Sequence, residues 1–363
     1  QYAETGHSIF ITPYKTLNKY LGLLGQQAPI ESNFIKALAD HLNAEIVNGT
    51  ISNIQEATVW LSYTFLYIRM KKNPLVYGIT QENIWEDSQL NKKRLELVTN
   101  AAKVLDQAMM CRYDESSGNL GVTDIGRIAS HYYISHNSIE SFNNMLVSHL
   151  NEKDALHVLC SSSEFDQLKV RPEETSELER LKRVVPMKVA SIDDTAGKVS
   201  ILLQVHCNSN IGASNGNNRS GSGSGGTRSF IPRVEAFTLQ SDSNYISQNA
   251  GRISRALFEI NMKRGWSNLA RTYLEISKAI DRRMNIHDNP LIQFKNELKP
   301  EILHKLQNIT NSNSSNSNLD HLLDMSIPEI GDMINDHKNS KNIYRLLKRL
   351  PYLYIDPIVQ PLT

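Results

Sequence analysis

Asn249, Arg252, Arg255 and Lys263 combine side chains suited to phosphates with a spacing suited to one helix. In a helix with 3.6 residues per turn, Asn249, Arg252, Glu259 and Lys263 share a face, and Arg255 lies one turn beyond Arg252. Arg and Lys supply most contacts to a phosphate backbone, and an amide can reach a base edge. This face could therefore hold a nucleic-acid strand. The alternative is a solvated polar face on an ordinary bundle helix.

The other side of the same stretch is apolar. Between Tyr245 and Trp266, aliphatic side chains recur at helical spacing and predict a helix over 246–264 that packs against a core. The apolar positions are Ile246, Ala250, Ile253, Leu257 and Ile260.

Motifs for catalysis are missing from the sequence. It contains no G-x-x-x-x-G-K-[ST], no H-E-x-x-H and no C-x-x-C. His131 and His136 lie five residues apart, which is not the i, i+4 spacing of a helical metal pair. The acidic pairs at 173–174 and 193–194 lie in polar runs, where we expect capping or surface charge. We therefore predict no catalytic residue, no bound cofactor and no metal site in this segment.

The composition limits the possible classes of protein. The 363 residues suffice for two to four domains, and 40% apolar residues can build real cores. With 39 basic and 38 acidic residues, any polyanion must be bound by a local stripe of charge. The three cysteines are widely separated, which favours a reducing compartment. The sequence contains no run of 18 apolar residues, so we predict no membrane span. Because the chain opens at Gln1 without a Met or a signal peptide, we interpret it as part of a longer protein.

The first third of the chain predicts two pieces. Residues 1–29 contain a β-branched run at 7–12 and a helix after Pro13, as in the last βα unit of a larger domain. In residues 30–123 a set of helices precedes a small hairpin, which is the pattern of a winged helix. The run at 60–70 is apolar nearly all round and predicts one largely buried helix.

The rest of the chain reads as mainly helical. We expect a helical bundle over 124–294, in which 198–207 fits a strand or a helix equally well by period. Residues 208–229 are rich in Ser, Asn and Gly and predict a disordered insertion, so the G-x-G-x-x-G within it is low complexity. Short helices with a basic last turn predict a helix–hairpin–helix domain over 295–352, interrupted by a second low-complexity tract at 308–318. Residues 353–363 predict a strand entering a further domain.

Several longer stretches resemble one family. They are similar to the large superfamily-two helicases with two tandem helicase cassettes, which include spliceosomal and signal-cointegrator members. The stretches are HLNAEIVNGTISN (41–53), WLSYTFLYIRMKKNPLVYGI (60–79), DIGRIASHYYISHNSIESFN (124–143), SEFDQLKVRPEE (163–174) and SDSNYISQNAGRISRALFEI (241–260).

This resemblance implies an order of parts. Residues 1–29 would end the second RecA-like domain, and 353–363 would begin an immunoglobulin-like (fibronectin-III-like) domain. The resemblance favours helix for 198–207. It also implies that 246–264 is the ratchet helix of an ATP-dependent 3′-to-5′ helicase, with the strand between it and the RecA domains.

The same resemblance suggests site residues and partners. Asn249, Arg252 and Lys295 match channel-facing positions, and Arg255 is a weaker candidate. ATP and Mg would bind in RecA domains outside this segment, which alone should be inactive. The partners would be single-stranded RNA or DNA, the protein's own RecA domains, and a large ribonucleoprotein or ribosome-associated complex in the nucleus, the cytoplasm or both, with no membrane.

Two questions stay open from the sequence. The segment could instead be a protein-interaction scaffold from a degenerate second cassette, with Arg252 and Arg255 ion-paired inside the fold. The choice between the spliceosomal and the cointegrator type is also open.

The predicted hairpin at 338–341 lacks the glycine usual in the family, so a phosphate contact from its backbone is not expected.

Overall fold

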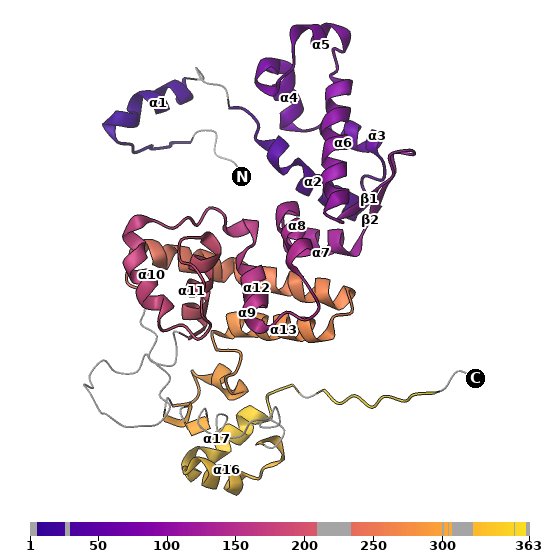
Figure 1. Ribbon diagram of the computed structural model, residues 1–363. Helices are drawn as coiled ribbons and strands as arrows, with labels where there is room; N and C mark the ends of the chain where they lie inside the picture. Colours follow the sequence, from indigo (N-terminus) through magenta and orange to yellow (C-terminus); the bar gives the residue numbers. More distant parts are fainter. Residues whose placement is uncertain are drawn as a thin grey trace. The chain divides into compact units, whose positions relative to one another are not determined.

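The structure is a computed structural model that describes residues 6–25, 30–208, 234–299, 301–303, 305–306, 322–351 and 353–360. The chain divides into two compact units, residues 1–130 and residues 131–363. Helices dominate both units, as predicted (Figure 1). The predicted low-complexity tracts at 208–229 and 308–318 lie outside the described residues, except for Asn208 at the end of a helix.

The N-terminal unit is built on three helices and a hairpin (Figure 1). α6 packs against α2, α3 and β1, and its buried face includes Val98, Ala102 and Leu105. The strands pair antiparallel with Cys111 opposite Val122, in the order expected of a winged helix. The elements are α1 (Tyr14–Leu24), α2 (Phe34–Asn48), α3 (Ile54–Leu61), α4 (Phe65–Lys72), η1 (Pro74–Tyr77), α5 (Gln81–Glu86), α6 (Asn91–Gln107), β1 (Cys111–Tyr113) and β2 (Leu120–Val122).

Two predictions for this unit were wrong. The run at 60–70 is not one buried helix, because α3 ends at Leu61 and the Thr64 hydroxyl caps a new helix by accepting from Tyr67 N. Tyr63 is 82% exposed and Ile68 is 49% exposed, so apolar content alone did not predict burial. Residues 7–12 form no strand within the described range 6–25, since a strand requires a partner to complete its hydrogen bonds.

Glu31 ties the start of this unit to α4 and η1. Its carboxylate accepts from Arg69 Nη2 at 2.8 Å, from Asn73 Nδ2 at 2.8 Å and from the Tyr77 hydroxyl at 2.8 Å. Hydrogen bonds from Arg69, then from Asn73 and Tyr77, lower the pKa of Glu31 from 4.5 to about 2. The charged carboxylate therefore favours the folded state.

We predict that Glu31→Gln destabilises the protein near neutral pH and that this effect fades in acid. Because the pKa of Glu31 is lower in the folded state, its contribution is complete above about 4.5 and disappears as the pH falls to about 2. Urea denaturation of both proteins across this range measures the difference, with Glu82→Gln on exposed α5 as control. A constant difference at all pH values would contradict the assignment.

The C-terminal unit is organised around one long helix. α12 packs against α13, α11 and α9, which surround its apolar face (Figure 1). The boundary between the units falls within α7 (Asp124–Tyr132), whose last two residues belong to this unit. The elements that follow are α8 (His136–Met145), α9 (Glu152–Cys160), η2 (Ser163–Phe165), η3 (Pro172–Glu174), α10 (Thr175–Lys182), α11 (Thr195–Asn208), α12 (Phe237–Lys263) and α13 (Ser267–Arg282).

α12 is longer than predicted. It begins at Phe237 rather than at 246, and its 27 residues span about 40 Å. The predicted apolar face is confirmed: its five members are at most 1% exposed. Residues 198–207, which fitted a strand or a helix by period, lie in helix α11, as the resemblance implied.

A buried ion-pair cluster holds the first turns of α12. Lys198 Nζ on α11 lies 2.7 Å from Glu174 Oε2 and 2.6 Å from Asp242 Oδ2 on α12. The Lys198 and Glu174 side chains are 0% exposed, and Arg171 completes the cluster from the surface. Although burial alone raises the pKa of Glu174, hydrogen bonds from Lys198, Thr238 and Arg171 outweigh it and lower the pKa. Glu174 is therefore not a surface charge, but the predicted capping role is confirmed, because its Oε2 accepts from the Arg171 backbone N–H at 3.3 Å at the start of η3.

The last part of the chain forms a small core of short helices. η4 (Pro290–Phe294), α16 (Ile327–Ile334) and α17 (His337–Leu347) contribute Leu291, Ile330 and Ile343 to it. Residues 338–341 lie inside α17, so the predicted hairpin at that position was wrong. The turn is at Asn335, whose φ of +55° places it in the left-handed region that asparagine tolerates. Residues 353–360 form no strand.

We predict that Lys198→Met lowers the free energy of unfolding by about 3 to 5 kcal/mol, because it removes the buried cation and leaves two buried carboxylates with only the partly exposed Arg171 as partner. Urea denaturation measures the change. Lys278→Met, the same substitution on the exposed face of α13, serves as control and should have an effect within about 0.5 kcal/mol. Equal effects of the two substitutions would show that the cluster does not stabilise the fold.

Candidate nucleic-acid interface

A stripe of accessible side chains runs along α12 at spacings of three or four residues. The stripe places amide groups before two guanidinium groups on one helix face, and Asn249 lies beside it. Sequence analysis missed the two amides at its start, although the same spacing rule identifies them. The stripe consists of Asn244, Gln248, Arg252, Arg255, Glu259 and Met262, of which Arg252 and Glu259 are half-buried and the others exposed.

Arg252 joins this stripe to the end of α7. Its Nη1 donates to Tyr132 O at 2.8 Å and to Tyr133 O at 2.5 Å. Its Nε and Nη2 donate to Asn249 Oδ1 at 3.1 Å and 2.9 Å. These four bonds use four of the five N–H groups of the guanidinium. Arg252 and Asn249 share a helix face, as predicted, and the hydrogen bonds between them hold the pair in a fixed arrangement.

The partners of Arg252 are neutral. Two are backbone carbonyls and one is an amide, and no carboxylate forms an ion pair with Arg252 within the described part of the chain. The amide of Asn249 is oriented by donating from Nδ2 to Tyr245 O at 2.9 Å, which leaves Oδ1 facing the guanidinium. Neutral acceptors fix the geometry of the guanidinium without cancelling its charge, so its field remains available to an anion.

Arg255 behaves differently, because it forms an ion pair with Asp281 on α13. Both side chains are accessible, at 54% and 40%, so the pair is weak and open to exchange. Near it, the Tyr132 hydroxyl donates to Glu259 Oε1 at 2.6 Å, and this bond with burial raises the pKa of Tyr132 to about 12. Glu259 therefore brings a negative charge to the far end of the stripe.

Lys295 lies at the end of another helix. Its Nζ donates to Arg282 O at 3.2 Å and Arg283 O at 3.3 Å, where α13 ends. Burial, together with the charge of Arg283, lowers the pKa of Lys295. Of the four predicted residues, Asn249 and Arg252 contact each other, Arg255 follows one turn later, and Lys295 belongs to a separate element.

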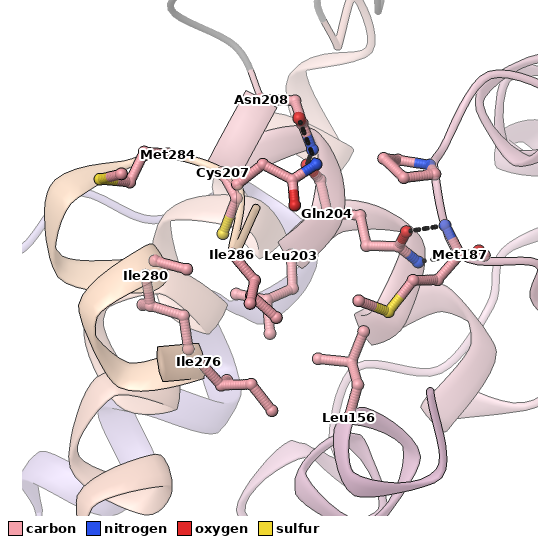
Figure 2. Close-up of a pocket in the computed structure, with 13 residues that line it drawn as sticks. Leu156, Met187, Leu203, Gln204, Cys207, Asn208, Ile276, Ile280, Met284 and Ile286 are labelled. Carbon is pink, nitrogen blue, oxygen red and sulfur yellow. Dashed lines mark hydrogen bonds between the residues drawn. The ribbon is translucent and has the colours of Figure 1, made fainter. Parts of the chain in front are cut away.

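An apolar pocket between α9, α11 and α13 offers little chemistry (Figure 2). Leu156, Leu203 and Ile276 line it, and the Gln204 amide on its edge exchanges hydrogen bonds with the backbone of Met187. Burial raises the pKa of the Cys207 thiol to about 12, so the thiol is protonated at neutral pH and is a poor nucleophile.

Two features are absent from the described residues. No group of three His, Cys, Asp or Glu side chains is arranged to hold a metal ion. No described helix has both the length and the apolar character that crossing a membrane requires.

Two family models match the chain. The family model of the Sec63 Brl domain matches residues 122–363, and a winged helix-turn-helix domain model matches residues 31–107. The chain is 41% identical to DExH-box ATP-dependent RNA helicase DExH14 of Arabidopsis thaliana, over all of this chain and 16% of that protein. It is 39% identical to activating signal cointegrator 1 complex subunit 3 of Gallus gallus, and 36% identical to the U5 small nuclear ribonucleoprotein 200 kDa helicase of Caenorhabditis elegans.

These two matches also cover the whole chain, and 15% and 16% of the relatives. The chain thus spans about one sixth of the length of the relatives it matches. Their similar identities leave the choice between the cointegrator and spliceosomal types open. The resemblance inferred from the quoted stretches is confirmed: the chain belongs to the Sec63 Brl domain family, in the winged-helix-plus-Sec63 arrangement of the large tandem-cassette superfamily-two helicases.

Proposed function

We propose that this segment guides a single nucleic-acid strand in an ATP-dependent 3′-to-5′ helicase and that α12 is its ratchet helix. The main support is that the guanidinium of Arg252 is held by neutral acceptors and lies on an accessible helix face. The relatives that cover the whole chain are named as helicases or as a subunit of a complex, which supports a helicase parent. RecA domains outside this segment bind ATP and Mg and step along the strand.

The stripe on α12 suits contacts that do not depend on sequence. A guanidinium attracts any phosphate, while the amides of Asn244 and Gln248 reach sugar or base atoms of any nucleotide. Arg255 joins these contacts when a phosphate displaces Asp281, and Lys295 supplies a further cation outside α12. Because α12 is packed on its apolar side, it keeps its shape while the motor domains move.

The proposed partners follow from the same reasoning. They are single-stranded RNA or DNA, the RecA domains of the same protein, and a large assembly in the nucleus, the cytoplasm or both. The names of the relatives include a cointegrator complex and a small nuclear ribonucleoprotein, which supports membership of a large complex. The family resemblance suggests a ribonucleoprotein or ribosome-associated complex as the setting.

The rival function is a scaffold that docks other proteins and does not unwind. The Arg255–Asp281 ion pair favours it, because a scaffold has no need for free cations along α12. Arg252 argues against it, since the scaffold interpretation predicted an ion pair there and the partners are neutral.

Asn249→Asp in the intact helicase tests strand guidance. The new carboxylate would lie against the Arg252 guanidinium and cancel its charge with little change of shape. We expect weaker binding of single-stranded RNA and a salt slope of log K that is smaller by about 0.7, as for one lost phosphate contact. Fluorescence anisotropy at several salt concentrations measures both. Asn268→Asp adds the same charge at an exposed position of α13 as control. Equal binding by wild type and Asn249→Asp would remove Arg252 from the strand path.

Asp281→Ala and Arg255→Ala separate the two functions. If a strand competes with Asp281 for Arg255, the first substitution should raise affinity for single strands and the second should lower it. Unwinding by the intact helicase should follow the same order. A scaffold predicts that neither substitution changes binding or unwinding.

A further inference from the structure

Tyr133 has an unusual backbone for its residue type. It follows α7 directly and has a φ of +54°, in the left-handed region where helices commonly end on glycine or asparagine. A side chain with a Cβ atom is disfavoured there. Local backbone preference therefore does not account for a tyrosine at this position.

Packing does not account for it either, because the Tyr133 side chain is 83% exposed. Leu90 has a similar φ of +53°, but its side chain is 3% exposed and its burial offsets the strain. A bulky residue that is both strained and exposed is the kind of local conflict that marks functional positions.

The position of Tyr133 beside α12 is well determined by hydrogen bonds. Arg252 Nη1 donates to the Tyr133 carbonyl at 2.5 Å and to the Tyr132 carbonyl at 2.8 Å. The Tyr132 ring is itself held by its hydroxyl bond to Glu259 and by an edge contact with the His131 ring at 4.9 Å. The exposed ring therefore stands on a fixed backbone at the edge of the α12 stripe.

We propose that the Tyr133 ring is a stacking platform for one base of the guided strand, an inference that rests on the proposed function. Every base has a flat π-face, so stacking on an aromatic ring tolerates any sequence, as a translocating strand requires. Arg252 would then have two roles. Its charge attracts the phosphate, and its hydrogen bonds hold the backbone of Tyr133 in place. The base stack holds the strand while the phosphate contacts change.

Tyr133→Gly in the intact helicase tests this proposal, because glycine removes the ring and also relieves the strained backbone. We expect equal or higher thermal stability together with about tenfold weaker binding of a fluorescein-labelled single-stranded RNA. The salt slope should stay unchanged, since stacking releases no counterions from the strand. Tyr133→Phe keeps the ring and should retain most of the affinity.

Tyr63→Gly is the matched control, because Tyr63 is also exposed, at 82%, and lies in the N-terminal unit. Unchanged affinity of Tyr133→Gly would overturn the stacking role, and so would a weaker affinity accompanied by a smaller salt slope. If Asn249→Asp weakens binding while Tyr133→Gly does not, strand guidance stands and only the stacking proposal fails. If neither substitution weakens binding, the proposed function fails as well.

Discussion

The contact between the Arg252 guanidinium and the carbonyls at the end of α7 determines what this region can do. A guanidinium bound by carboxylates would form a structural ion pair, and its positive charge would be neutralised within the fold. Because Arg252 is bound by two carbonyls and an amide oxygen, its orientation is fixed and these partners do not neutralise its charge. The same bonds position Tyr133 next to that charge. A cation and an aromatic ring are thus held at one edge of α12 by a single set of hydrogen bonds.

That arrangement depends on α12 keeping its place. Its apolar face is packed against α9, α11 and α13, and its first turns are held by Lys198 through Asp242. The cluster is costly to desolvate, and it is tolerated because each buried charge has an opposite partner within hydrogen-bond distance. One end of α12 is thus fixed by charges that water cannot reach, while its middle presents charge that water can reach.

The helical period was enough to predict which side of α12 is buried and which side is polar, because a repeat of 3.6 residues is a property of the backbone. The period did not predict where α12 begins: the stretch FTLQSDSN is rich in residues that favour caps and turns, and tertiary packing overrides that preference. The pairing of Glu174 and Asp242 with Lys198 was also beyond local reasoning, since the three residues come from distant parts of the chain. The strained backbone of Tyr133 could not be predicted either, because the spacing of apolar and polar residues carries no information about a positive φ.

Mapping crosslinks between the intact helicase and a single-stranded RNA that carries photoactivatable uridines would test strand guidance by α12 most directly. If α12 guides the strand, crosslinked residues within this segment concentrate along the accessible stripe from Asn244 to Glu259 and at Tyr133, beside Arg252. Crosslinks that avoid α12 while the same protein unwinds RNA would contradict strand guidance by α12.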